Sequence, residues 1–480
     1  MTATANRPRH PGGGQPGVAV TGLPPGPRAP RALQTYLWLT RPTWVFEQCA
    51  RRYGDPFLLQ VMLAGNLVYT ADPGVVREVF KADPHQFHAG DAYILMEPVG
   101  GPTSIFLLDE ERHLRMRRLL LPQFHGELLK RWRPVIEQMT VEEIERWPRG
   151  TPFPLRPRTE AITLEVIMRI VFGIRESERA VELRDLLPRL FAVNLLQAPS
   201  FVYPKLRRDL GPRSPWGKFL RLRGRIDELL YEEIRQRREM LAGRTRAEAP
   251  DAAGAPDPAG PPDPSGPPDP AGPPDDILTL LLSVHDDEGR GLTDDELRDQ
   301  LITMLLAGHE TTSSALAWAF ERLLRTPAAL GRLHDEVERG EGEYMDAVIK
   351  ETLRIRPVAA HVARQLQVET EIAGYRLPRR TVIAPSIYLI HRNPRLYPDP
   401  GAFRPERFLG EDPPDHYGWI PFGGGVRRCL GASLATLEMQ VVISTILRSV
   451  RLRAARAKPE GIGVLGVTLV PARGAEVIAG

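Results

Sequence analysis

One glycine-rich turn constrains this chain more than any other feature, because it places a cysteine directly before a helical stretch. The turn reads FGGGVRRCLG over Phe422–Gly431, and helical periodicity begins at Ala432. Glycines let the backbone approach a bound group closely and direct N–H groups at an anion. The N-terminus of a helix also stabilises a thiolate over a thiol. The pattern therefore favours a metal-binding sulfur anion at Cys429, although a lone cysteine is more often an inert core residue.

The cysteine count limits which disulfides and metal clusters the chain can form. The chain has two cysteines, Cys49 and Cys429, which lie far apart and form no C-x-x-C pair. This count predicts no disulfide framework and suits a reducing compartment. Two thiolates cannot hold a four-cysteine iron–sulfur cluster, so an iron–sulfur electron donor must be a separate protein.

Length and charge exclude several other classes of protein. The 480 residues are 42% hydrophobic, which is enough for a large core. The net charge is only +3 and the arginines are spread along the chain, so we expect no nucleic-acid partner. The N-terminus lacks an apolar signal region, and no run approaches the ~18 apolar residues of a membrane span. We therefore expect a cytoplasmic protein without a membrane anchor.

A long apolar helix, expected from Asp294 to Leu324, carries the second motif, AGHETT at 307–312. Glycine and three hydroxyl residues weaken a helix at this point and can let water into its hydrogen bonds. Ala307 and Thr311 are spaced i,i+4 and share one face, so small Ala307 leaves room for a molecule beside the Thr311 hydroxyl. Glu310 points elsewhere and can relay protons. Taken alone, the pattern equally fits a hydroxyl that bonds the preceding turn.

The third motif is Glu351-Thr352-Leu353-Arg354, followed downstream by Phe403–Phe408, which reads FRPERF. Glutamate and arginine at i,i+3 form an ordinary surface ion pair in most proteins, so the first half means little alone.

Together these residues resemble the cytochrome P-450 superfamily, in its soluble bacterial form. F-x-x-G-x-R-x-C-x-G is that family's haem-binding loop, and the resemblance runs from about Pro24 to the C-terminus. It implies a mainly α fold with small β-sheets, the single-domain cytochrome P-450 fold, and heme b (iron protoporphyrin IX) as cofactor. Cys429 would be the thiolate ligand of the iron. The rest of the loop would bind the cofactor through Phe422, Gly425, Arg427 and Gly431.

The resemblance also assigns roles to the long helix. Glu310 and Thr311 fall on the family's acid–alcohol pair, and Ala307 and Gly308 lie just before them at the cofactor. His309 precedes the acid and is not expected to bind metal.

Two groups of charged residues complete the expected site. Glu351, Arg354 and Arg407 resemble the family's buried Glu–Arg–Arg network, in which losing one member leaves an uncompensated charge. Haem carries two propionates, which Arg and His bind through charge-assisted hydrogen bonds. The residues that match propionate-binding positions are His113, Arg117, Arg364 and Arg427. A basic helix such as 112–118 more often just faces water, and its other arginines, with Arg428, could dock an acidic electron donor.

The function implied is a haem-thiolate monooxygenase. It would insert one oxygen atom of O2 into a small lipophilic substrate, such as a fatty acid or terpenoid. Electrons would come from a ferredoxin or flavodoxin with its NAD(P)H-dependent reductase, and the enzyme would be a monomer. Two alternatives remain from the sequence: a peroxygenase or isomerase that needs no electron donor, and a haem-binding sensor without turnover.

The expected organisation has three parts. Residues 1–31 form a Pro/Gly-rich disordered tail, and residues 32–480 form the enzyme domain. A Pro-rich surface insertion at 250–275 lies within that domain, with a repeat that forbids helix and sheet. Two apolar segments could contact substrate or be plain core. They are Tyr93, Ile94, Leu95, Met96, Val99, Ile105 and Phe106, and Phe191, Val193, Leu195, Leu196, Phe201 and Val202.

Overall fold

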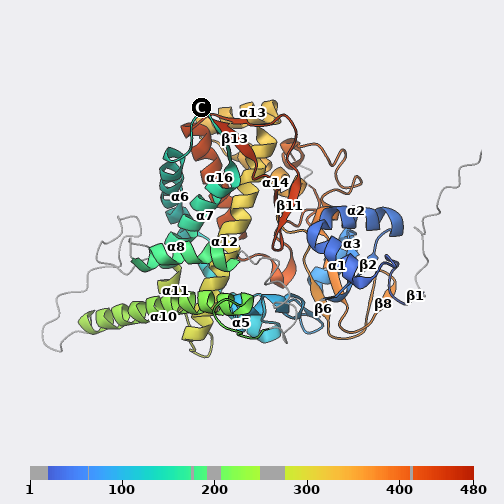
Figure 1. Cartoon of the computed structure of the whole chain (residues 1–480), viewed down its shortest axis with the longest axis horizontal. Coiled ribbons are helices and arrows are strands. Elements are labelled where there is room, and N and C mark those ends of the chain that lie inside the picture. Colours follow the sequence, from blue (N-terminus) through green and yellow to red (C-terminus); the bar gives the residue numbers. More distant parts are fainter. Residues whose placement is uncertain (1–19, 63, 174–177, 192–206, 249–275, 411–413) are drawn as a thin grey trace, which may run out of the picture.

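Helix α12, Asp294–Leu323, runs through the centre of the molecule, and the other elements are arranged around it (Figure 1). The computed structural model describes residues 20–62, 64–173, 178–191, 207–248, 276–410 and 414–480. A capping box starts α12, because the Thr293 side chain accepts from the Glu296 N–H and Glu296 accepts from the Thr293 N–H. Most of its residues are buried, as expected for a helix that is apolar on nearly all sides.

The α-helices, in chain order, are α1 Arg31–Thr40, α2 Pro42–Tyr53, α3 Pro73–Lys81, α4 Glu97–Gly100, α5 Glu110–Leu120, α6 Glu127–Glu145, α7 Leu155–Phe172, α8 Glu178–Phe191, α10 Pro215–Glu248, α11 Ile277–Ser283, α12, α13 Pro327–Arg339, α14 Glu343–Ile355, α15 Ile387–Ile390 and α16 Ala432–Ser449. Short 3-10 turns are η1 Asp91–Met96, η2 Leu121–Phe124, η4 Pro405–Phe408 and η5 Gly425–Arg427.

The strands are short and gather in small sheets. The largest sheet has the order β2-β3-β9-β6-β4, and the others have the orders β1-β8-β7, β10-β13-β5 and β11-β12. The strands are β1 Val20–Thr21, β2 Phe57–Val61, β3 Gly65–Thr70, β4 Phe87–His88, β5 Pro152–Pro154, β6 Arg364–Leu366, β7 Thr370–Ile372, β8 Tyr375–Leu377, β9 Val382–Pro385, β10 Leu452–Ala454, β11 Ile462–Leu465, β12 Thr468–Pro471 and β13 Glu476–Ala479.

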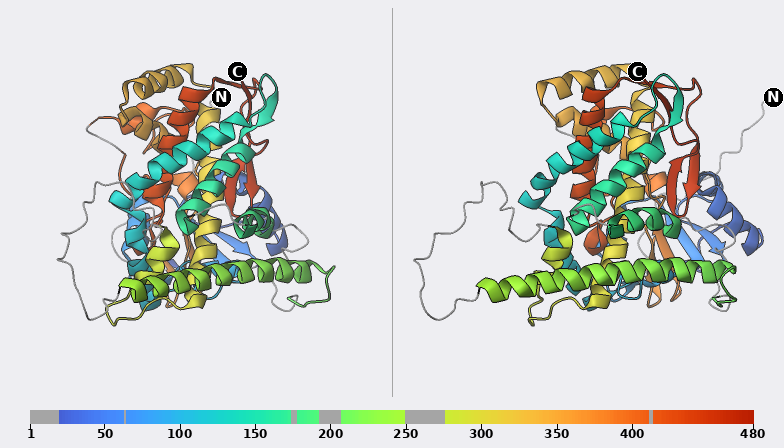
Figure 2. Two further views of the ribbon diagram at one scale, coloured as in Figure 1. Left: turned by 90° about the vertical axis from the view of Figure 1, so that its left-hand side faces the viewer. Right: turned by 60° about the vertical axis from the view of Figure 1, so that its left-hand side comes forward.

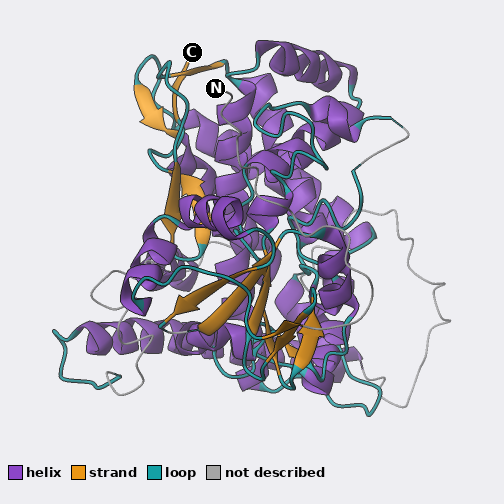
Figure 3. Ribbon diagram, turned by 90° about the vertical axis from the view of Figure 1, so that its right-hand side faces the viewer, coloured by secondary structure: helices purple, strands orange, loops and turns teal. Residues whose placement is uncertain are grey.

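The molecule divides into a helical bundle and a sheet-rich lobe. In the bundle, α7 and α16 pack along α12, and α10 crosses one end of it (Figure 2). The five-stranded sheet and helices α1 to α3 form the lobe, where most of the strands lie (Figure 3). One large hydrophobic cluster fills the bundle, and two smaller clusters fill the lobe. Cys49 belongs to a lobe cluster and is buried there.

The structure confirms the mainly α class with small sheets. The proline and glycine signals of the sequence predict a helix from about Pro42 to Tyr53. Helix α2 has those bounds, and Gly54 ends it with φ 84°. α12 is helical throughout, so the weakened hydrogen bonding expected near Gly308 produces no break. The chain is already placed at Val20, ahead of the expected boundary at residue 31, because β1 pairs with β8. The whole Pro-rich insertion, and the second apolar segment beyond Phe191, lie outside the described residues.

Candidate active site

The Cys429 turn is closed by its own backbone. The Cys429 N–H donates to the Phe422 carbonyl at 2.9 Å, and the Arg428 N–H donates to the Gly425 carbonyl at 3.1 Å. Gly423 and Gly425 have φ values of 66° and 65°, a left-handed conformation that favours glycine. The turn holds the cysteine in place directly before α16.

The glycine run also allows the turn to lie against Phe80 of α3. A Cβ on Gly424 would lie 2.1 Å from the Phe80 ring, and one on Gly425 would lie 2.1 Å from the Phe80 carbonyl oxygen. Any side chain at either position would push the turn away from α3. Contact with the lobe therefore fixes where the loop, and with it Cys429, stands.

Cys429 has a mixed electrostatic environment. Burial raises the pKa of its thiol, while a hydrogen bond from the Gly431 backbone and the charges of Arg117 and Arg428 act in the opposite direction. Its side chain nevertheless remains exposed. Cys49 differs, because burial alone raises its pKa to about 11 and no neighbouring cation counteracts it.

Three arginines and a histidine converge beside this turn. Burial and the charges of Arg427, Arg117 and Arg364 lower the pKa of His113 to about 3. Burial lowers the pKa of Arg364 and of Arg427, the latter to about 10. Arg117 donates to the Arg428 carbonyl at 2.8 Å, which links this cluster to the Cys429 turn. All four residues come from the propionate group expected from the sequence, so the structure places that set together.

The motifs did not predict the two groups that face this cluster, the Asp109 carboxylate and the Tyr93 phenol. Asp109 pairs with Arg427, and the Tyr93 phenol lies close enough to Arg364 and Arg427 for their charges to act on its pKa. Burial raises the pKa of Tyr93, so the phenol stays neutral. Within the described chain, the three arginines therefore face one carboxylate, and the excess positive charge suits a bound dianion. The two carboxylates of haem fit that need.

On α12, the acid and the alcohol point to different neighbours. The Thr311 hydroxyl donates to the Ala307 carbonyl at 2.7 Å. The Glu310 carboxylate bonds the hydroxyl of Thr468 on β12, and that hydroxyl also lies 2.7 Å from the Leu465 carbonyl. Thr468 has one hydroxyl hydrogen, so it can donate to Glu310 when the acid is ionised, or accept from it and donate to Leu465 when the acid is protonated. Thr468 thus accommodates both protonation states of Glu310.

Gly308 and His309 turn away from this group. A Cβ on Gly308 would lie 2.9 Å from Ile167 Cδ1 of α7, so close helix packing accounts for this glycine. His309 is buried, and its Nδ1 lies 2.7 Å from the Leu305 carbonyl. That hydrogen bond within the helix agrees with the expectation that His309 binds no metal.

Glu438 on α16 is a further buried acid near this helix. Burial raises its pKa well above the ordinary value, and a hydrogen bond with Thr312 of α12 opposes that shift only in part. Its Oε1 has no hydrogen-bond partner in the part of the chain that the structure describes. Burial of this kind favours the neutral form of the carboxyl.

The three residues of the expected Glu–Arg–Arg network, Glu351, Arg354 and Arg407, lie together in the structure. Glu351 and Arg354 are both fully buried, with Arg354 Nε 2.6 Å from Glu351 Oε2. Arg407 Nε lies 3.5 Å from Glu351 Oε1, and the Arg404 N–H donates to the same oxygen at 2.8 Å. Arg354 also donates to the carbonyls of three residues in the following loop, His391, Pro400 and Ala402.

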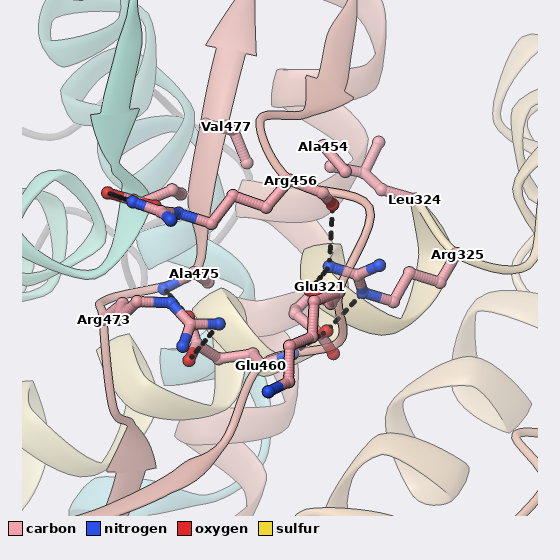
Figure 4. A pocket seen from close by; sticks show the side chains of 11 residues that line it. Glu321, Leu324, Arg325, Ala454, Arg456, Glu460, Arg473, Ala475 and Val477 are labelled. Atoms are coloured by element: carbon pink, nitrogen blue, oxygen red, sulfur yellow. Dashed lines mark hydrogen bonds and ion pairs between the residues drawn. The ribbon is translucent and has the colours of Figure 1, made fainter.

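A hollow at the far end of α12 is unrelated to this site (Figure 4). Arg325 donates to Glu321 at 2.5 Å, and Arg473 pairs with Glu460 at 3.3 Å. These charges pair with one another and tie α12 to the C-terminal strands, so the hollow is a structural ion network.

Comparison with known proteins decides the family. The family model described as Cytochrome P450 matches residues 24–472. The chain belongs to the cytochrome P450 family. Cytochrome P450 135B1 of Mycobacterium tuberculosis is 38% identical over 467 residues, covering 96% of this chain and 92% of that protein. Cytochrome P450 138 of the same species is 34% identical over 466 residues, covering 96% and 97%.

Solved structures support the P450 fold over the whole chain. A retinoic acid-bound cyanobacterial CYP120A1 matches with a TM-score of 0.77 at 22% identity, covering 95% of this chain and 99% of that one. The cytochrome P450DA heme domain also gives 0.77, at 23% identity, covering 96% and 98%. At these identities the likeness shows the fold alone.

Family membership confirms the predicted enzyme class and cofactor. The chain is a haem-dependent monooxygenase that requires O2 and redox partners. Among the described residues, no helix is both long and apolar enough to cross a membrane.

Proposed function

We propose that this P450 inserts one oxygen atom of O2 into a lipophilic small molecule, with Cys429 as the thiolate ligand of the haem iron. Fatty acids, terpenoids and similar secondary metabolites are the substrate classes, and hydroxylation or epoxidation is the reaction. A thiolate ligand pushes electron density onto haem iron and favours O–O cleavage, which is the chemistry the cofactor supplies. The turn that holds Cys429 between a Gly431 N–H and two arginines is the observation that carries the proposal.

In this proposal the cation cluster holds the cofactor's carboxylates. His113, Arg117, Arg364 and Arg427 are the candidates, and Tyr93 can add a neutral hydroxyl donor. His113 is neutral in its surroundings, so it would donate one N–H, while the arginines supply the charge. Phe422, Gly425 and Gly431 shape the loop, and Ala307 leaves space on the α12 face. The packing of Gly308 against Ile167 gives that residue a role between helices instead.

Proton supply is the task we assign to α12. Glu310 would be the acid of the relay, and its carboxylate is bonded by the Thr468 hydroxyl, which also lies against the Leu465 carbonyl. Thr311 offers a hydroxyl on the neighbouring face, where it can pass a proton onward by rotating away from the Ala307 carbonyl. Loss of Thr311 therefore removes the last donor, whereas loss of Glu310 removes the group that titrates.

A separate ferredoxin or flavodoxin with an NAD(P)H-dependent reductase would supply electrons to the face around Arg428. Arg112, Arg118 and Arg428 are exposed there and can attract an acidic partner. Arg115 is excluded from that role, because it pairs with Asp286 at 2.7 Å and Glu296 at 2.9 Å.

The lipophilic substrate class rests on the first apolar segment. Ile94 and Phe106 are 51% and 40% exposed, while Val99 and Ile105 are buried core. The segment therefore divides into packing residues and accessible apolar residues that a substrate can contact.

Replacement of the thiol tests the central assignment. Cys429→Ser should lose the strongly red-shifted Soret band of the ferrous–CO complex, and the matched Cys49→Ser should keep it. An unchanged band in Cys429→Ser, with loss in Cys49→Ser, would show that the assignment is wrong. NAD(P)H consumption with surrogate redox partners then separates a monooxygenase from a haem sensor.

A further inference from the structure

The β11–β12 hairpin lies beside α12 and has an anchored base and an exposed tip (Figure 1). At the base, the Leu469 N–H donates to the Val358 carbonyl at 2.7 Å. The Trp318 indole of α12 donates to the Leu469 carbonyl at 3.3 Å. The tip is a two-residue turn of Gly466, with φ 55°, and Val467, which is 74% exposed. A molecule that touches this end of the hairpin can therefore shift the tip more easily than the base.

Thr468 stands where the tip meets the base. It is the first residue of β12, it pairs across the hairpin with Leu465, and it is buried. A second backbone pairing joins it to Ala359, on the segment that follows α14. Its hydroxyl oxygen lies 2.5 Å from Glu310 Oε1 and 2.7 Å from the Leu465 carbonyl oxygen. The same hydroxyl thus contacts an acid of α12 and the carbonyl at the start of the turn.

The Thr468 hydroxyl has one hydrogen, so it has two arrangements between these oxygens. When Glu310 is ionised, the hydroxyl donates to the carboxylate, and the Leu465 carbonyl loses this donor. When Glu310 is protonated, the acid donates to Thr468, and the hydroxyl can donate to Leu465. The side-chain hydrogen bond that closes the turn is therefore made with the neutral acid and given up with the ionised acid.

The described residues around Glu310 include no charged group that could take over from Thr468. No ion pair reaches the Glu310 carboxylate in that part of the chain. The neighbouring His309 is buried, and burial lowers its pKa, so its ring is neutral at neutral pH. Thr311 directs its hydroxyl to the Ala307 carbonyl at 2.7 Å. A change in the charge of Glu310 therefore acts first on the Thr468 hydroxyl.

We propose that Thr468 is a positioning residue that couples the turn of the β11–β12 hairpin to the protonation of Glu310. A molecule that holds the turn closed against Thr468 favours the protonated acid, and one that opens the turn favours the ionised acid. By linkage, ionisation of Glu310 loosens the turn to the same extent. The consequence for turnover rests on the proposed role of Glu310 in proton supply, whereas the coupling itself does not.

Infrared difference spectra of the haem-loaded protein test the coupling without turnover. The C=O band of protonated Glu310 is the band that disappears in Glu310→Gln. Thr468→Val removes the donor that stabilises the ionised carboxylate, so this band should titrate at higher pH than in the unmodified protein. Thr468→Ser keeps a hydroxyl and should restore the original titration. Haem spectra and melting temperatures identify variants that are folded. A Glu310 band that titrates alike in all three proteins overturns the proposal.

Hydrogen exchange measures the same coupling from the hairpin. In Glu310→Gln the neutral amide can donate to Thr468 as the protonated acid does, which leaves the hydroxyl free to close the turn. Above the pH at which the Glu310 band titrates, amides of the β11–β12 hairpin should therefore exchange more slowly in Glu310→Gln than in the unmodified protein. The difference should vanish when both proteins also carry Thr468→Val. Amides of the β7–β8 hairpin, in another sheet, are the control and should not change. A difference that persists without the Thr468 hydroxyl contradicts the coupling.

Turnover with a surrogate redox partner separates this inference from the proposed function. If Glu310 supplies protons, Thr468→Val should change the yield of product per NAD(P)H, Thr468→Ser should restore it, and Thr468→Val should add nothing in a Glu310→Gln background. Normal turnover in Glu310→Gln would remove Glu310 from proton supply and leave the infrared and exchange results standing. Slow turnover in Glu310→Gln, with spectra and exchange that ignore Thr468, would instead remove Thr468 alone.

Discussion

At the scale of single residues, the sequence motifs identify Cys429, Glu310 and Thr311 because each stands in a short local pattern. Their partners could not be found in the same way. Thr468 lies 158 residues from Glu310, and only the packing of β12 against α12 brings them together. Glu438 follows the Cys429 turn on α16, with apolar Leu434, Val441 and Val442 at i−4, i+3 and i+4, so the pattern places it on an apolar face. No motif singles it out, and its partner Thr312 lies on α12.

The Thr311 hydroxyl provides the first prediction at this scale. Thr311→Ala should keep fold, haem and substrate binding, because the Ala307 carbonyl retains its place in the helix and alanine is a better helix former. Coupling should fall: NAD(P)H is still consumed, but more oxygen leaves as hydrogen peroxide and less as product. Glu310→Gln should instead slow the whole cycle. Undiminished coupling in Thr311→Ala, with a substrate lacking a hydroxyl, would remove Thr311 from the mechanism.

Glu438 predicts a pH dependence of stability. Its folded pKa lies well above the unfolded value of 4.5, so the folded protein binds one proton more between these two values. Stability should therefore fall as pH rises from the unfolded pKa towards the folded pKa. Glu438→Gln keeps the shape and removes the titration, so its melting temperature should decline less over that range. Parallel curves for the two proteins from pH 5 to 9 would show that Glu438 is not buried as a neutral acid.

At the scale of elements, the sequence predicts where a helix begins and ends when the signals are local. It does not predict which face of the helix is buried. The pattern from Pro42 to Gly54 gives α2 correctly, since proline and glycine mark its ends. In α1 the polar Gln34 and Thr35 are buried, because Gln34 donates to the Ala29 carbonyl and Thr35 accepts from the Met62 N–H. The sequence also gave no indication that Gly308 is needed where α7 crosses α12.

That crossing leads to a prediction about helix packing. The hydroxyls of Thr159 and Thr163 on α7 donate to the carbonyls of Ser313 and His309 on α12, both at 2.9 Å, so α7 cannot move away freely. Gly308→Ala gains about 1 kcal/mol of helix propensity, but its Cβ meets Ile167 and overpacking costs about 1–3 kcal/mol. The melting temperature should therefore drop, and Gly308→Ala with Ile167→Val should recover part of the loss. A stabilised single variant would contradict the close contact.

At the scale of the whole molecule, the family likeness covers nearly the full chain, and the Pro-rich stretch is the main departure. Composition alone predicts that 250–275 forms no helix or sheet. The structure adds firm anchors on both sides. Arg237 on α10 bonds Asp276, which also caps α11 by accepting from the Thr279 N–H at 2.7 Å. Residues outside the insertion therefore hold α10 and the start of α11 together on either side of it.

Because of these anchors, deletion of Ala255 to Pro273 tests whether the insertion is needed for the enzyme domain to fold. Glu248 lies eleven helical steps beyond Arg237, so the chain must return about 16 Å to reach Asp276. The eight residues left after deletion span up to about 26 Å, which is sufficient. A shorter loop also costs less closure entropy. Haem content and melting temperature should therefore stay nearly unchanged. Asp276→Ala is the destabilising control, because it removes the fully buried carboxylate that pairs with Arg237. Loss of haem or of folding on deletion would show that the segment belongs to the enzyme domain and is not a surface insertion.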